Sequence, residues 1–175
     1  MNSQLIEECR QGNVRSQYRL YNQYVKAMYN LACRMLYNRE DAEDIIQEAF
    51  TDCFANIATY RYESTFGAWL KSIVVNKCIN HLKRKKADLV NEETLPEPAI
   101  METETEPRYN HRQVLSAIER LPDGYRMIFN LYMMEGYDHE EIASILGISE
   151  STSKSQYMRA KEKIKKILLD EQRNR

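Results

Sequence analysis

Apolar residues recur every three or four positions along most of the chain, the spacing that one face of an α-helix requires. In the first half the clearest stripe runs through Leu20, Tyr24, Ala27, Met28, Leu31 and Met35. Only five glycines and four prolines interrupt these runs. The pattern therefore predicts an all-α fold. Its first-half helices cover about residues 3–9, a long stretch reaching Met35, a third stretch after a break at Asn38, and about residues 66–86.

The second half shows the same periodicity in shorter segments. A helix is predicted over about residues 109–120, and Pro122 suits the first turn of the next one because its fixed φ matches that position. Further on, Ile142, Ala143 and Leu146 lie on one side of a short helix. The fold class predicted from the whole pattern is two small helical bundles.

Residues 138–163 predict a helix-turn-helix. Gly147 can adopt the left-handed conformation that ends a helix, and Ser149 can cap the next one. That arrangement can lay one helix in the major groove of DNA. An ordinary helical hairpin with solvated charges is the alternative. The outward residues of the second helix, and so the candidate DNA contacts, are Lys154, Ser155, Met158 and Arg159.

An acidic segment separates the two halves. Residues 87–107 hold three of the four prolines and seven acids without a base, a composition with little to bury, so we predict an extended acidic linker. The domains predicted on either side are residues 1–86 and residues 108–175, the second of which contains the helix-turn-helix.

Charge is segregated along the chain although its formal net value is only −1. Residues 40–52 carry six acids and no lysine or arginine, whereas residues 71–86 carry six bases and no acid. This alternation predicts separate acidic and basic surfaces for different partners. An acidic helix face can dock a basic protein, or it can simply be solvated.

The basic part of the fourth helix comes just after a group of aromatic residues, among them Phe66 and Trp69. Aromatic rings beside basic side chains are what single-stranded nucleic acid needs, because rings stack on bases and cations neutralise phosphates. The alternative is that the aromatics belong to the core and the bases to a solvated helix end.

Nothing in the sequence predicts catalysis, so we expect no enzyme, no cofactor and no metal site. Phosphate-binding, zinc-protease and nucleophile motifs are missing, and the three histidines are isolated. The four cysteines are far apart in apolar contexts, which favours buried free thiols over disulfides or zinc. We also expect a soluble, cytoplasmic protein without membrane insertion, because we find no signal peptide and no long apolar run.

Three stretches in this order resemble the bacterial sigma factors of the extracytoplasmic-function group: DAEDIIQEAF (residues 41–50), residues 59–86 and residues 121–164. The resemblance implies a transcription initiation factor that binds core RNA polymerase and directs it to promoter DNA. Three positions depart from the family pattern. Tyr62 stands where glycine often occurs, Ser153 where a β-branched apolar residue is frequent, and Lys161 where arginine is common.

The same resemblance implies site residues and partners. The first stretch would dock on the clamp helices of the largest polymerase subunits, the second would melt the −10 element and capture a flipped base, and the third would bind the −35 element. An anti-sigma protein is a further expected partner. The implied polymerase contacts are Asp41, Asp44, Gln47 and Glu48. The implied −10 contacts are Tyr60, Arg61, Asn76, Lys83 and Arg84. The implied −35 contacts are Lys154, Ser155, Met158 and Arg159.

Two other functions stay open from the residues alone. A stand-alone helix-turn-helix regulator would explain the second half but would not require the acidic helix or the aromatic-basic one. A helical adaptor that binds only proteins would use the charged patches as docking faces.

Overall fold

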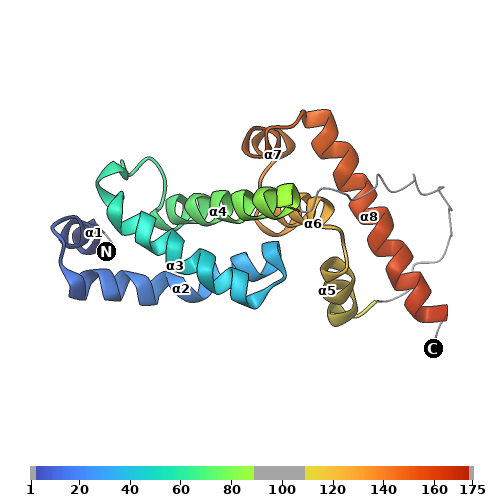
Figure 1. Ribbon diagram of the computed structural model, residues 1–175, viewed down its shortest axis with the longest axis horizontal. Coiled ribbons are helices and arrows are strands. Elements are labelled where there is room, and N and C mark those ends of the chain that lie inside the picture. Colours follow the sequence, from blue (N-terminus) through green and yellow to red (C-terminus); the bar gives the residue numbers. More distant parts are fainter. Residues whose placement is uncertain (1–2, 89–108, 174–175) are drawn as a thin grey trace. The chain divides into compact units, whose positions relative to one another are not determined.

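The computed structural model describes residues 3–88 and 109–173, with side chains described up to residue 85 in the first range, and every regular element in these ranges is helical (Figure 1). The predicted all-α fold is confirmed. The chain divides into two compact units, Met1–Leu82 and Lys83–Arg175. The linker predicted at residues 87–107 lies almost entirely outside the described residues, so it and the domain limits drawn around it stay predictions.

The first unit is built from four α-helices and one short 3-10 turn. The two long helices α2 and α3 lie side by side, and α1 packs against α2 and the turn η1 (Figure 1). The elements are α1 (Ser3–Arg10), α2 (Val14–Leu36), α3 (Arg39–Ala55), the turn η1 (Ile57–Thr59) and α4 (Phe66–Asp88), which runs past Leu82, the last residue of the unit.

Local sequence signals set most helix ends in this unit. Asn13 accepts a hydrogen bond from the Ser16 amide at the start of α2, and Asn38 accepts bonds from two amides at the start of α3. Glu40 and Asp41 then lie in the first turn of α3, where negative charge suits the helix dipole. The break predicted at Asn38 is therefore confirmed.

The core of the first unit lies between the apolar faces of its helices. Burying a large aliphatic side chain contributes about 1.5–3 kcal/mol, so this cluster is the main source of the unit's stability. Cys9, Cys53 and Cys78 are buried in it and Cys33 is half-buried, and all four thiols are free, as predicted. The largest fully buried side chains here are Ile6, Leu20, Leu31, Met35, Ile45, Leu70, Val74 and Val75.

The second unit is organised around one long helix. Helix α8 (Glu150–Arg173) contacts α5 (His111–Glu119), α6 (Asp123–Phe129) and α7 (His139–Leu146). The cluster of buried residues in this unit joins α5, α6 and α8 and includes no residue of α7. The residues of this cluster are Ala117, Ile118, Leu121, Phe129, Ala160, Ile164 and Leu168.

A π-helical turn, η2 (Asn130–Met134), continues α6. The sequence periodicity predicted an ordinary helix through this segment and gave no sign of the wider turn. Tyr132, Met133 and Met134 are exposed on it.

Arg126 holds the connection between α5 and α6. Its side chain is 5% exposed and donates hydrogen bonds to the carbonyl oxygens of Glu119 (3.2 Å) and Leu121 (2.9 Å) and to the carboxylate of Asp123. These bonds supply donors to carbonyl oxygens near the end of α5, of which that of Leu121 is buried. A charged side chain is thereby tolerated in the interior, because it is paired and hydrogen-bonded.

Candidate protein and nucleic-acid interfaces

The acidic face of α3 points away from the core. Ala42, Ile45, Ile46 and Ala49 are buried, so the residues between them face solvent. Of the predicted contacts on this helix, Asp44, Gln47 and Glu48 are exposed and Asp41 is half-buried.

Two side chains of helix α4 lie against the two ends of this acidic face. The Lys77 amine lies 2.7 Å from the Asp52 carboxylate and 3.2 Å from that of Glu48, and His81 Nε2 lies 3.2 Å from Asp41 Oδ2. The hydrogen bonds to Asp52 and then Glu48 raise the pKa of Lys77, although burial acts in the opposite direction. Asp44 lies between these ion pairs, and its exposed carboxylate is well placed to meet a basic partner.

A loop of residues 60–65 joins η1 to α4 and rests on a cluster of aromatic rings. The Tyr60 ring lies 5.3 Å from that of Trp69 and, at right angles, 5.5 Å from that of Phe66. The Tyr60 hydroxyl donates to the carbonyl oxygen of Ser64 at 2.6 Å and so closes the loop. Phe66 is buried and Trp69 is half-buried.

This geometry separates the predicted −10 residues into supporting and exposed ones. Tyr60 is only 4% exposed, so in this conformation it supports the loop and has no free ring face for a base. Arg61 and Asn76 are exposed, and Lys83 and Arg84 are exposed near the end of α4.

Helix α1 contributes two residues to this loop that sequence reasoning missed. Arg10 donates to the carbonyl oxygens of Ile57 (3.4 Å) and Tyr60, and its guanidinium lies 5.2 Å from the centre of the Tyr62 ring. The Tyr62 hydroxyl donates to Glu7 Oε1 at 3.0 Å. The only available signal was that Tyr62 replaces a frequent glycine, and it gave no hint of the partner.

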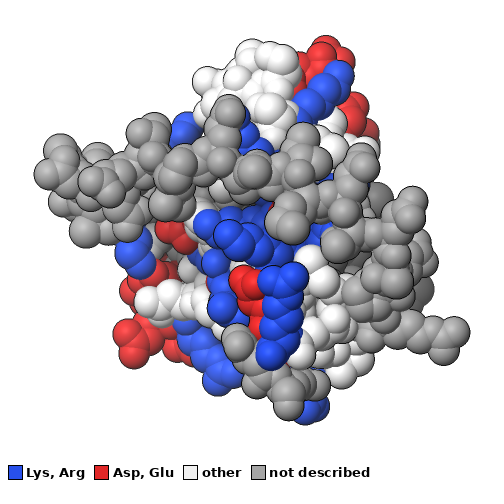
Figure 2. Space-filling view, turned by 90° about the vertical axis from the view of Figure 1, so that its right-hand side faces the viewer, with Lys and Arg blue, Asp and Glu red and all other residues white. Residues whose placement is uncertain are grey.

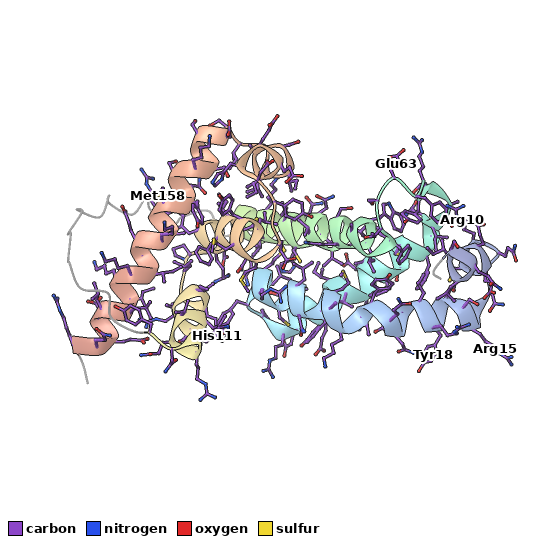
Figure 3. All side chains as sticks on the ribbon, turned by 180° about the vertical axis from the view of Figure 1, so that it is seen from behind. Arg10, Arg15, Tyr18, Glu63, His111 and Met158 are labelled. Atoms are coloured by element: carbon purple, nitrogen blue, oxygen red, sulfur yellow. The ribbon has the colours of Figure 1, made fainter. Side chains whose placement is uncertain are left out.

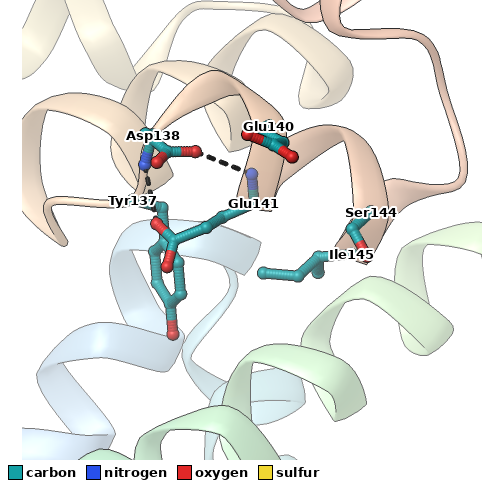
Figure 4. Close-up of a pocket in the computed structure, with 6 residues that line it drawn as sticks. All are labelled: Tyr137, Asp138, Glu140, Glu141, Ser144 and Ile145. Atoms are coloured by element: carbon teal, nitrogen blue, oxygen red, sulfur yellow. Dashed lines mark hydrogen bonds between the residues drawn. The ribbon is translucent and has the colours of Figure 1, made fainter.

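The helix-turn-helix of the second unit is defined by its caps. In a reciprocal pair, the Glu141 amide donates to Asp138 Oδ1 at 2.8 Å and the Asp138 amide donates to Glu141 Oε2 at 2.9 Å (Figure 4). Gly147 ends α7 with a φ of +69°, and Ser149 Oγ accepts from the Thr152 amide at 3.0 Å. The turn predicted from Gly147 and Ser149 is confirmed.

The second helix of the motif, α8, exposes the predicted polar face. Ser153 and Ala160 are fully buried on the opposite side, which fixes the rotation of the helix. Ser153 Oγ lies 2.9 Å from Nδ1 of His139, whose ring stacks on Tyr132 at 4.4 Å between centroids. The buried polar Ser153 is therefore partnered, by a histidine that the sequence left isolated. The exposed residues are Lys154, Ser155, Met158 and Arg159.

Positive charge predominates on the exposed side of α8. Residues 151–166 contain six basic residues and one acidic residue, Glu162. Figure 2 shows lysine and arginine side chains crowding the face of the molecule that carries this helix. Such a surface can neutralise phosphates, while the polar side chains at the start of the helix can reach base edges.

The described residues offer little for small-molecule chemistry. A shallow pocket at the start of α7 is lined by Tyr137, Asp138, Glu140, Glu141, Ser144 and Ile145 (Figure 4). Two of these acids are engaged in the capping pair, and three carboxylates in one place repel an anionic ligand. Among residues 3–88 and 109–173 no group of three or more histidine, cysteine, aspartate or glutamate side chains could hold a metal ion. Within the same ranges, no helix has the length and apolar character to cross a bilayer.

Two regions of the chain match known family descriptions. Residues 20–87 match Sigma-70 region 2, and residues 111–164 match Sigma-70, region 4. The chain is 31% identical over 165 residues to the ECF RNA polymerase sigma factor SigW of Bacillus subtilis, covering 84% of this chain and 86% of that protein. It is 30% identical over 173 residues to the ECF RNA polymerase sigma-E factor of Haemophilus influenzae, covering 91% of each.

Solved structures show the same fold. The sigma factor RpoE, in complex with the anti-sigma factor NepR from Bartonella quintana, matches with a TM-score of 0.58 at 21% identity over 89% of this chain and 98% of that one. CnrH, in complex with the cytosolic domain of CnrY, matches with a TM-score of 0.54 at 20% identity over 94% of each chain. With both sigma-70 regions in order and relatives aligned over most of its length, the chain belongs to the extracytoplasmic-function sigma factors of the sigma-70 family, the subunits that direct RNA polymerase to promoters.

Proposed function

We propose that this sigma factor divides promoter recognition among three surfaces. The acidic face of α3 docks on core polymerase, the 60–65 loop with α4 opens the −10 element, and the exposed side of α8 reads the −35 element. The observation that carries the proposal is the geometry of the helix-turn-helix. Its caps hold α8 so that a buried stripe and an exposed basic stripe lie on opposite sides.

Docking is assigned to Asp41, Asp44, Gln47 and Glu48 on α3, facing the clamp helices of the largest polymerase subunits. The contact of Asp41 with His81 and the ion pair of Glu48 with Lys77 support this assignment, because they leave Asp44 as an exposed charge between them. Complementary charge orients and speeds association of such surfaces.

The −10 assignment rests on Arg61, Asn76, Lys83 and Arg84, with Tyr60 as the buried support of the loop. Cations along α4 neutralise the backbone of the unwound strand, while a loop residue contacts an unstacked base. Unstacking a base costs a few kcal/mol, which binding to the loop offsets.

The −35 assignment rests on Lys154, Ser155, Met158 and Arg159. A helix in the major groove reads bases by side-chain hydrogen bonds and apolar contacts, and each good pairing contributes about 1–3 kcal/mol of discrimination. Lys154 is paired to Glu150 at 2.6 Å in the free protein, so we expect that pair to open when phosphate competes for the amine.

Regulation by an anti-sigma protein is part of the same proposal. Two proteins of the same fold were solved as complexes, the sigma factor RpoE with the anti-sigma factor NepR and CnrH with the cytosolic domain of CnrY. Because polymerase and promoters lie in the bacterial cytoplasm, we place the action of this chain there.

The experiment that tests the proposal is run-off transcription from a promoter library with core polymerase, with and without this protein. New start sites that depend on the protein are expected and give both promoter elements. Specific DNA binding by the protein alone, with no new start sites, would instead favour a stand-alone regulator.

A charge reversal then tests the docking surface. Asp44→Lys is expected to abolish holoenzyme assembly while the helical circular dichroism stays unchanged, because the exposed side chain contributes little to the core. Glu63→Lys, the same reversal on the exposed 60–65 loop, is the control and should assemble normally. Normal assembly by Asp44→Lys would remove the docking assignment.

A further inference from the structure

Helix α1 reaches the 60–65 loop through one arginine. Arg10 forms bonds to the carbonyl oxygens of Ile57 and Tyr60, and a third bond, at 2.8 Å, joins it to Glu7 Oε1. Figure 3 shows Arg10 between α1 and the loop that carries Glu63, whereas Arg15 and Tyr18 point away from the bundle. The planar guanidinium fork can serve several acceptors at once, which a lysine amine does less well.

The loop needs such support because Tyr62 is held in an unfavourable backbone conformation. Its φ is +61°, in the left-handed region where a side chain crowds the backbone and glycine is normally preferred. Its hydroxyl bonds to the same Glu7 oxygen that receives Arg10, and its ring lies over the guanidinium. One carboxylate oxygen and one guanidinium therefore hold both the backbone and the side chain of the loop.

Glu7 and Arg10 lie before the matched family region, which begins at residue 20, whereas the loop that they contact lies within it. Helix α1 also has an ordinary structural role, because Ile6 and Cys9 are buried in the core. Glu7 is exposed and the Arg10 side chain is 25% exposed, so burial of the helix does not require either of them.

We propose that Glu7 and Arg10 form a clasp that positions the 60–65 loop for capture of an unwound base, so that single-strand binding depends on α1 whereas −35 recognition does not. The clasp rests on the proposed function of the loop. Arg10 is a positioning residue in this scheme, because its bonds go to the backbone that presents Arg61 and not to the DNA.

The test measures binding of the assembled holoenzyme to two probes from a promoter mapped by run-off transcription. One probe is the single-stranded non-template −10 strand, and the other is the −35 duplex. Arg10→Ala is expected to weaken binding of the single strand about tenfold, since losing hydrogen bonds from a charged donor costs on the order of 1.5 kcal/mol. Binding of the −35 duplex and holoenzyme assembly should not change.

Two further variants separate positioning from charge and from unfolding. Arg15→Ala removes the same charge from an exposed position at the start of α2 and should bind both probes like the wild type. Tyr62→Gly removes the strained side chain, so adding Arg10→Ala to it should weaken single-strand binding by less than about threefold. An equal loss in both backgrounds, or wild-type binding by Arg10→Ala, would overturn the clasp.

A failure of the proposed function would look different. If the wild-type holoenzyme bound only the −35 probe, the loop would have no capture role and the clasp would fall with it. If the wild type bound the single strand and Arg10→Ala did so equally well, the loop would keep its role and only the clasp would be lost.

Discussion

Arg10 and Arg126 both donate hydrogen bonds to the carbonyls of a turn, but they do so over very different lengths of chain. The carbonyl acceptors of Arg126 lie 5 and 7 residues away, whereas those of Arg10 lie 47 and 50 residues away. The first arginine is buried and closes a connection between successive helices. The second is partly exposed and joins a terminal helix to a distant loop.

The same difference separates the two DNA-facing elements. The caps of the helix-turn-helix come from within three to five residues, as with Asp138 and Glu141. The 60–65 loop depends partly on Tyr62 and Glu7, which are 55 residues apart. We therefore expect substitutions in the second unit to act mainly on its stability or its own contacts, and those at the clasp to act mainly on the shape of the loop.

The largest expected effect is that of Arg126→Ala. Removing the side chain takes a donor from the buried Leu121 carbonyl and breaks the bonds to Glu119 and Asp123, so the free energy of unfolding should fall by about 3 kcal/mol. Urea denaturation followed by circular dichroism measures the loss. Arg120→Ala, which removes only an exposed pair with Glu171, should cost less than about 1 kcal/mol. Equal losses in the two variants would mean that burial of Arg126 does not set its importance.

Arg159→Ala should separate the two elements by function. We expect it to weaken −35 duplex binding by about 1–3 kcal/mol, because Arg159 is exposed on the reading side of α8. Single-strand binding should stay unchanged, which is the reverse of the pattern expected for Arg10→Ala. Titrating the holoenzyme of each variant with both probes tests whether the two substitutions have these opposite effects. A variant that lost both activities equally would contradict it.

Gly147→Ala should show what the turn of the helix-turn-helix requires. No atom lies within 4 Å of an added Cβ, so the cost comes from the positive φ alone and should be about 1–2 kcal/mol. Gly124→Ala, inside α6 where an added Cβ meets only Gln156 Oε1 at 4.0 Å, should have the opposite sign and stabilise by about 0.5–1 kcal/mol. Urea denaturation of both variants and the wild type measures the two changes in the free energy of unfolding. Changes of the same sign in both variants would refute the argument from backbone conformation.

The smallest effect near neutral pH concerns the cysteines, all of which lie in the first unit. Burial raises the pKa of Cys53 and of Cys78 from 9.0 to about 12. The unfolded chain then releases protons above pH 9 that the folded chain keeps, so stability should fall as pH rises from 9 toward 12. In the second unit, burial raises the pKa of Tyr137 and Tyr157 above 10.0. The stability of the second unit should therefore begin to fall at a pH about one unit higher than the stability of the first unit.

The single tryptophan, Trp69, lies in the first unit and reports its unfolding by fluorescence. Urea denaturation at several pH values between 8 and 11 gives the slope of stability with pH. Cys53→Ala with Cys78→Ala should flatten that slope, whatever their effect at pH 8. An unchanged slope would show that the thiols are not responsible.

Local signals explain most of what the sequence predicted correctly. Asn38, Gly147 and Ser149 act on neighbouring amides or on their own backbone, so their effect can be read from the adjacent residues. The apolar stripe gave most of the buried face of α2, although Ala27 on it is exposed, because helical spacing is a local property.

Features that depend on distant partners could not be predicted in this way. An aromatic residue beside basic ones suits a stacking platform and a core equally well, and only the surrounding rings show that Tyr60 is buried. The clasp joins Glu7 and Arg10 of α1 to the 60–65 loop, and the bond between His139 and Ser153 joins α7 to α8. The π-helical turn has no periodic signature, because five residues are too few to show a change of spacing.

The span of the Arg10 contacts has a consequence for how the protein is made. Closing a segment of about fifty residues costs entropy before any contact compensates it, so such contacts tend to form late in folding. During synthesis α1 emerges long before Ile57 and Tyr60, and its arginine has no loop to hold until the helices between them have packed. A partly folded chain can therefore carry a complete acidic helix yet lack an ordered 60–65 loop. The ability to bind core polymerase would then appear earlier in the life of each molecule than the ability to open DNA.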